Sequence, residues 1–247
     1  MSRESVATPT VINSEAEQIM ENRLLAALPS EEYEQLKTKL KPVELSLGEI
    51  LFEPPDQIRN LYFPTSAIIS FLTELPDGDS IEVGLVGYEG MAGVDVILGV
   101  NTASKVATVQ HAGCALKIAT PALKEAFNRG GKLQQYLLQY THALMSQISA
   151  SVLCNAHHKI DGRVARWILM YHDRLERDEF LMTHEFMANM LGIRRAGVSE
   201  VAKKLQHEGL IDYYRGHFRI LNRKALEEKA CGCFSVIEKE FNSLYKQ

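Results

Sequence analysis

A basic helical stretch is the first part of this sequence whose residue types could do chemistry. Leu191–Leu205 reads LGIRRAGVSEVAKKL, in a chain of 247 residues with a net charge of −4. Residues 183–224 nevertheless hold 8 Lys and Arg against 4 Asp and Glu, a local surplus of +4. Affinity for nucleic acid follows the local density of cations that displace counterions from phosphates, rather than the charge of the whole chain. The stretch therefore predicts a nucleic-acid contact, with a solvated helix face as the plain alternative.

A second group of reactive side chains lies at helical spacing. Its members are Cys154, His157, His158 and Asp161. Their offsets of 0, 3, 4 and 7 would place all of them on one face of a continuous helix. Thiolate, imidazole and carboxylate groups together can hold Zn²⁺ or Fe²⁺. The group leaves open a metal- or redox-dependent sensor or enzyme, and the alternative is a solvated helix end in which Asp161 caps the next helix.

A Cys-Gly-Cys sequence near the end of the chain invites a redox interpretation. Cys231 and Cys233 lie, however, within a run of apolar residues at helical spacing. That run is Leu226, Ala230, Phe234, Ile237, Phe241 and Leu244. Such a stripe favours a helix that packs against the rest of the protein. No Cys–His–acid set has the spacing of a hydrolase, so we expect neither an enzyme nor a cofactor.

The elements that would position the basic residues form a helix-turn-helix. Thr183 can cap a short helix at His184–Leu191. Gly192 ends this helix, and a second helix begins near Arg194. In this motif the second helix enters the DNA major groove by its N-terminal end. The residues that would pack the two helices together are Met187, Ala188, Leu191, Val198, Val201 and Leu205.

A basic hairpin follows the second helix. GLIDYYRGHFRIL predicts two strands that turn at Arg215 and Gly216 and form a β-wing. The candidate DNA contacts of the helices and the wing are Thr183, Arg194, Arg195, Ser199, Lys203, Lys204, Arg215, His217 and Arg219.

In the first half of the chain, the residue pattern changes from one typical of helices to one typical of β-strands. A helical pattern runs from Asn22 to about Lys41, with Ser30 placed to cap its main part. From Val43 to about Ile118, short apolar runs alternate with turn signals. Those signals are Pro54-Pro55, Pro76-Asp77-Gly78 and Gly113. Short strands at this spacing predict an antiparallel sandwich or barrel.

A long helix separates the β-rich part from the basic part. Its apolar stripe is Leu133, Leu137, Tyr140, Leu144, Ile148 and Val152, at steps of three or four residues. A stripe of this length is typical of a coiled-coil seam, so these residues are the candidate dimer interface. The alternative is a helix that lies on its own β domain.

Composition limits the class of protein. The chain is 46% hydrophobic and 23% charged, which is typical of a soluble globular protein. No apolar run is long enough to span a bilayer, and residues 1–18 lack the basic start and apolar core of a secretory signal. Four cysteines are too few for a disulfide framework. We therefore expect a cytoplasmic protein with no membrane partner.

The domain organisation follows from these patterns. We expect a polar tail at 1–20, a β domain at 21–130, the long helix at 131–159, a DNA-binding domain at 160–224 and a helical extension at 225–247.

The order of these elements resembles the Crp/Fnr superfamily of bacterial transcription regulators. DGRVARWIL at Asp161–Leu169 is similar to the G-R-[IV]-A helix start of that family, and Thr183 to Gly192 fits its T-x8-G pattern. The resemblance implies an α+β fold with a cyclic-nucleotide-binding-like antiparallel β-roll, a long dimerisation helix and a C-terminal winged helix-turn-helix. It also implies a homodimer on a near-palindromic double-stranded DNA operator, with RNA polymerase as a further partner.

The sensor half departs from the cyclic-nucleotide-binding members of that family. Those members carry Gly-Glu for the ribose, then Arg-Ser or Arg-Thr for the phosphate. Here Met91 follows Gly90, and no Arg occurs between Arg59 and Arg129. Lys105 is the nearby cation, and it lacks the bidentate fork of Arg. A response to cyclic AMP is therefore not expected.

The positions of cysteine and histidine bear on two other sensor branches of the family. No Cys precedes Cys114, which argues against the N-terminal iron–sulfur cluster of the oxygen-sensing branch. No His precedes His111, although this alone leaves the haem-sensing branch open. The signal, if there is one, stays open.

The second helix also departs from the family at single positions. Arg195 matches an Arg of the catabolite-activator branch that can bind guanine O6 and N7. Ser199 matches a Ser of the oxygen-sensing branch, whereas Ala196 replaces the usual Glu and Glu200 the usual Arg. We expect a dimeric, sequence-specific DNA-binding regulator with an operator of its own, and an architectural DNA binder without a sensing role is the remaining alternative.

Overall fold

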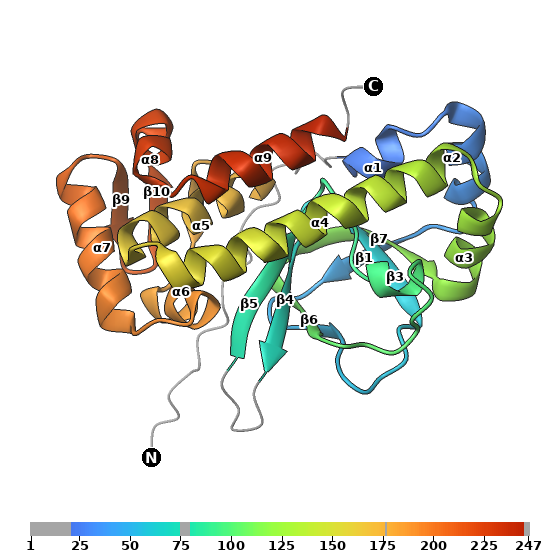
Figure 1. Ribbon diagram of the computed structural model, residues 1–247, viewed down its shortest axis with the longest axis horizontal. Coiled ribbons are helices and arrows are strands. Elements are labelled where there is room, and N and C mark those ends of the chain that lie inside the picture. The colour runs from blue at the N-terminus through green and yellow to red at the C-terminus, as the bar shows by residue number, and fades with distance from the viewer. Residues whose placement is uncertain (1–20, 75–79, 176, 245–247) are drawn as a thin grey trace, which may run out of the picture.

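The computed structural model describes residues 21–74, 80–175 and 177–244. The expected polar tail at 1–20 lies outside these residues. A β-rich domain and a helical domain lie at opposite ends of the molecule, and the long helix α4 runs between them (Figure 1). Within the described ranges, no helix combines the length and the apolar character that crossing a membrane requires.

Two short helices precede the first strand, within the stretch where the sequence predicted a helical pattern. They are α1 at Arg23–Ala26 and α2 at Ser30–Lys37. Asn22 caps α1, since its side chain accepts a hydrogen bond from Leu25 N at 3.3 Å. The expectation that Ser30 is a cap was wrong, because the N-cap of α2 is the preceding proline and Ser30 is already the first helical residue.

The β domain is an antiparallel roll of two sheets. Its strands are β1 at Lys41–Leu45, β2 at Ile50–Phe52, β3 at Asn60–Pro64, β4 at Ile68–Glu74, β5 at Ser80–Val86, β6 at Val106–His111 and β7 at Gly113–Ala119. One sheet has the order β1-β7-β3 and the other has the order β2-β6-β4-β5. All registered pairs are antiparallel, which confirms the predicted β-rich class of this half. A short 3₁₀ turn, η1 at Val94–Val96, crosses between β5 and β6.

The long helix packs on this roll. After α3 at Thr120–Asn128, α4 spans Gly131–His157. Four members of the expected dimer stripe, Leu133, Leu137, Tyr140 and Leu144, are between 0% and 6% exposed within the single chain. The side-chain amide of Gln147 fixes the contact, because it accepts from Leu85 N at 2.7 Å and donates to Leu85 O at 3.2 Å. Most of the stripe therefore belongs to the core of the single chain. This agrees with the alternative interpretation, in which the helix lies on its own β domain, rather than with a dimer interface.

The remaining elements form the helical domain and its extension. They are α5 at Ile160–Leu175, β8 at Glu179–Leu181, α6 at His184–Leu191, α7 at Arg195–His207, β9 at Ile211–Tyr214, β10 at His217–Ile220, α8 at Arg223–Lys229 and α9 at Cys233–Ser243. Strand β8, which the sequence patterns did not predict, joins the two wing strands in the order β8-β10-β9. The single C-terminal helix expected from the apolar stripe is two helices, with a break at 230–232, and α9 lies along α4 (Figure 1).

A buried carboxylate joins the two domains. Glu82 on β5 accepts hydrogen bonds from Ser70 Oγ at 2.8 Å, Gln110 Nε2 at 2.9 Å and Trp167 Nε1 at 2.8 Å. Trp167 belongs to α5, so the bond crosses from the roll to the helical domain. Burial raises the pKa of the Glu82 carboxyl above its ordinary value, and the three hydrogen bonds oppose that rise.

Candidate nucleic-acid interface

The boundaries of the two central helices follow from local capping. Thr183 Oγ1 accepts a hydrogen bond from Phe186 N at 3.1 Å, which caps α6 as predicted. Gly192 then adopts a left-handed conformation with φ +59° and ends α6. Arg194 is extended and is the N-cap residue of α7. The predicted helix-turn-helix is confirmed to within one residue at each boundary.

The face between the two helices is apolar. The packing residues expected from the sequence, Met187, Ala188, Leu191, Val198, Val201 and Leu205, are all buried. A cation fixes the end of α6, because Arg163 Nη2 on α5 donates to Leu191 O at 2.5 Å. A positive charge at a helix C-terminus also interacts favourably with the helix dipole. The orientation of the motif is thus set by α5, which is buried over most of its length.

Three of the predicted contacts lie exposed on the second helix or at its start. Arg194, Arg195 and Lys203 have exposed side chains. Arg195 Nε lies 3.8 Å from Glu185 Oε2, with side-chain exposures of 69% and 62%. An ion pair that long and that exposed contributes little, so Arg195 remains available to a ligand.

Two other predicted contacts are engaged within the protein. Ser199 Oγ lies 2.9 Å from His184 Nδ1, and the ring of His184 stacks on Tyr213 with centroids 4.0 Å apart. Burial lowers the pKa of His184, and the nearby charge of Arg195 lowers it further. Lys204 pairs with Asp161 at the start of α5. Ser199 thus bonds across the motif, whereas the Lys204–Asp161 pair, with side chains 53% and 45% exposed, is a surface ion pair that contributes little stability.

The wing separates into a basic tip and a neutralised base. Arg215 has φ +47° and Gly216 has φ +88°, so the tight turn lies where the sequence predicted it. Arg215 and His217 are exposed at this tip, and the guanidinium of Arg215 lies 5.2 Å from the centre of the Tyr214 ring. Arg219 instead lies between two carboxylates, 3.3 Å from Glu179 and 3.7 Å from Asp212.

The residues of the roll at the positions that match the nucleotide site of the resembled family are buried or paired within the protein. Met91 is 0% exposed, and its backbone oxygen accepts a hydrogen bond from Tyr140 Oη at 3.0 Å. A Cβ added to Gly90 would lie 2.2 Å from the Tyr140 ring. Lys105 Nζ is paired with Asp95 Oδ1 at 2.9 Å, and both side chains are about 15% exposed. The charge of the nearby cation is thus already neutralised.

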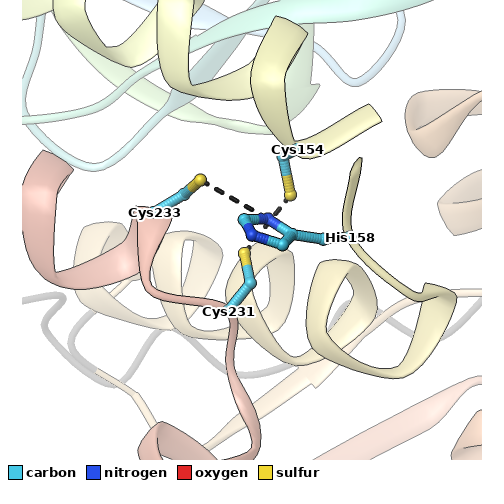
Figure 2. A group of neighbouring side chains, drawn as sticks. All are labelled: Cys154, His158, Cys231 and Cys233. Atoms are coloured by element: carbon cyan, nitrogen blue, oxygen red, sulfur yellow. Dashed lines mark hydrogen bonds between the residues drawn. The ribbon is translucent and has the colours of Figure 1, made fainter. Parts of the chain in front are cut away.

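The expected group of Cys154, His157, His158 and Asp161 does not assemble. The helix that was to carry all four ends at His157, and His158 is extended with φ −97° and ψ 146°. Asp161 therefore lies on the next helix beside Lys204, and His157 is exposed. Cys154 and His158 instead meet Cys231 and Cys233 (Figure 2). Sequence spacing could not place a segment that follows about 70 residues later in the chain.

Comparison with known proteins agrees with this geometry. Residues 162–229 match the Crp-like helix-turn-helix domain family. A transcriptional regulator of the Crp/Fnr family from Eubacterium rectale is 19% identical, with a TM-score of 0.61 over 83% of this chain and 96% of that chain. FixK2 from Bradyrhizobium japonicum is 14% identical, with a TM-score of 0.65 over 78% and 98%. A CRP-family transcriptional regulator from Thermus thermophilus is 22% identical, with a TM-score of 0.61 over 76% and 96%.

No relative was found among curated protein sequences. The solved structures match over nearly their whole length, so the likeness extends from the roll through the long helix to the wing. The chain therefore has the fold of the Crp/Fnr family of transcription regulators and carries a Crp-like helix-turn-helix domain.

Proposed function

We propose that this protein is a homodimeric, sequence-specific DNA-binding transcription regulator that acts in the cytoplasm on a double-stranded operator. The observation that carries the proposal is the start of α7, where exposed Arg194 and Arg195 follow a Gly192 turn. A recognition helix reads bases with its N-terminal residues. RNA polymerase is a further partner of this proposal, and enzymatic activity is no part of it.

The exposed cations divide into two roles by position. Arg195 is the first residue of α7, so its guanidinium can reach guanine O6 and N7 in the major groove. Lys203 lies two turns further along the helix, and Arg215 lies at the tip of the wing. Both are placed to contact phosphates, which position the protein without reading sequence.

The dimer seam is proposed on the outer face of α4. Leu138, Met145 and Val152 repeat every seven residues and are 47%, 61% and 64% exposed. His142, Ser149 and Ala156, each four residues after one of these, are exposed as well. In a two-helix coiled coil both core positions of the heptad are usually apolar, and here one of the two is apolar in each heptad. Of the stripe first expected, Val152 alone lies on this face.

Replacing Arg195 with alanine should relax sequence reading more than it weakens binding. We expect a loss of about 1–3 kcal/mol of discrimination at one base pair per half-site, because a bidentate guanine contact is removed. The preferred operator is first selected from a randomised duplex library. Affinities for this operator and its single-base variants are then measured at several salt concentrations.

Lys203→Ala and Arg215→Ala are the matched controls for this measurement. Each should weaken all sequences alike and lower the salt slope by about one to two units for a dimer, because it removes one phosphate contact per chain. An Arg195→Ala protein with an unchanged base preference and a uniform loss of affinity would refute the assignment of Arg195 as the reader.

Cyclic AMP should leave the protein unchanged. The position of the ribose-binding Glu is occupied by buried Met91, and Lys105 is paired with Asp95. Millimolar cyclic AMP should therefore change neither the melting temperature nor the DNA affinity. Because a ligand that binds the folded state stabilises it by RT ln(1 + [L]/Kd), a clear thermal shift would contradict this expectation.

A further inference from the structure

Three of the four cysteines of the chain meet one histidine where α4 joins the DNA-binding domain. Cys154 lies in the last turn of α4, and His158 follows that helix directly. Cys231 lies between α8 and α9, and Cys233 is the first residue of α9. The four donor atoms lie within 4.8 Å of one another and converge on one point (Figure 2). The fourth cysteine, Cys114, is in β7.

The distances between donor atoms suit a tetrahedral metal ion. Cys154 Sγ lies 3.3 Å from Cys231 Sγ, and Cys233 Sγ lies 3.6 Å from His158 Nδ1. Zinc bonds of about 2.3 Å to sulfur and 2.0–2.1 Å to nitrogen give tetrahedral edges of about 3.8 Å for S···S and 3.5 Å for S···N. These two distances match the required edges to within about half an ångström, and all four donor atoms lie within 4.8 Å of one another.

We propose that Cys154, His158, Cys231 and Cys233 form a Zn²⁺ site. Three thiolates and one imidazole are a standard set for a closed structural zinc centre, in which the protein supplies all four ligands. The set contains no oxygen donor, so it is unsuited to Mg²⁺ or Ca²⁺. With no position left for substrate or water, the site fixes structure and does no chemistry.

Backbone hydrogen bonds hold the ligands in place before any ion binds. His158 N donates to Cys154 O at 3.1 Å, which fixes these two residues relative to each other. Cys231 N donates to Gly162 O at 3.2 Å, which holds the segment between α8 and α9 against the start of α5. A Cβ on Gly162 would lie 3.2 Å from Cys231 N, so glycine at this position allows the close approach.

A buried cation matches the charge of such a centre. Zn²⁺ with three thiolates carries a net charge of −1. The guanidinium of Arg166 is on α5, is 4% exposed, and interacts electrostatically with Cys154, Cys231 and Cys233.

Zinc would cross-link the end of α4 and the residue that follows it to the segment between α8 and α9 and the first residue of α9. Cys154 and Cys231 are 77 residues apart in sequence. Because the site requires the folded arrangement, zinc binding stabilises the folded state. The full chain, purified under reducing conditions, should contain one zinc per chain, and chelation should lower its melting temperature.

Cobalt substitution tests the ligand set directly. The reduced full chain, stripped of zinc, should bind one Co²⁺ per chain and develop the visible absorption of tetrahedral, thiolate-bound cobalt. Cys231→Ser and Cys233→Ser should lose this absorption and stoichiometric zinc. Cys114→Ser and His157→Ala are the matched controls, since each removes a residue of the same type outside the site, and both should keep one ion per chain.

Several results would overturn the zinc assignment. Folded, reduced protein of the natural sequence that binds neither Zn²⁺ nor Co²⁺ stoichiometrically would do so, and this measurement needs no variant to fold. Full retention of the cobalt spectrum by Cys231→Ser would do the same. Iron with sulfide in the purified chain, or a Cys154–Cys231 disulfide that forms in the presence of zinc and reductant, would assign the cluster to a different chemistry.

Discussion

Trp167→Ala is expected to lower the free energy of unfolding by about 3–5 kcal/mol, the range for removing a large buried aromatic side chain. Trp167 is 1% exposed and stacks on Tyr171 with ring centroids 5.3 Å apart. Its Nε1 is also a donor to the buried Glu82, so truncation removes both packing and a hydrogen bond to a carboxylate. Denaturant unfolding followed by circular dichroism measures the loss.

Trp167→Phe separates the two contributions. Phenylalanine keeps most of the packing but removes the donor, so we expect a smaller cost of about 1–3 kcal/mol. A cost below about 1 kcal/mol for Trp167→Ala would contradict the interface between α5 and the roll.

Glu82→Gln checks the same interface through pH. Because the pKa of Glu82 is raised in the folded state, its contribution to stability is fully present below the ordinary carboxyl pKa and is lost as pH rises through the folded value. Glutamine cannot ionise, so the variant should lack this loss. Trp167 is the only tryptophan in the chain, and its fluorescence reports on the site in both proteins.

Met145→Glu is expected to weaken homodimerisation by at least about 100-fold, or about 3 kcal/mol, because the proposed seam would bring the two carboxylates together. Met145 is 61% exposed in the single chain, so the melting temperature of the monomer should hardly change. Analytical ultracentrifugation over a concentration series measures the association.

Two variants make this result specific. Leu144 is the preceding residue but is 2% exposed, so Leu144→Glu should unfold the protein rather than dissociate it. Leu47→Glu, at a residue that is 67% exposed between β1 and β2, should affect neither fold nor association. A monomeric natural chain at micromolar concentration, or a Met145→Glu protein that still dimerises normally, would rule out this seam.

Local signals made the helix-turn-helix predictable. Thr183, Gly192 and the turn at Arg215 act on neighbouring backbone, so their effect can be deduced from the nearest residues in sequence. The apolar packing of α6 on α7 followed from helical periodicity in the same way. The antiparallel class of the roll was predictable for similar reasons, since its turns interrupt short apolar runs.

What the sequence left undetermined depends on contacts between distant segments. The stripe on α4 is apolar whether it faces a partner or the chain's own roll, so periodicity could not show that Leu144 packs inside the single chain while Met145 is exposed on the other face. Ser199 and Lys204 lie on a polar face, but their partners come from His184 and Asp161 on other helices. Cys231 and Cys233 likewise reach Cys154 and His158 only because α9 packs against α4.

The folding back of α9 limits how the DNA-binding domain can move. Residues 160–229 leave α4 through the connector at 158–159 and return to it through the connector at 230–232. The two connectors are close together, since His158 Nδ1 lies 3.6 Å from Cys233 Sγ and Cys231 N donates to the oxygen of Gly162 at the start of α5. A domain attached through one linker can rotate about any axis. A domain attached through two neighbouring linkers can rotate mainly about the line that joins the two attachment points. In the proposed dimer, a change in the spacing of the two recognition helices would then follow mainly this rotation, with α5 and the wing moving together.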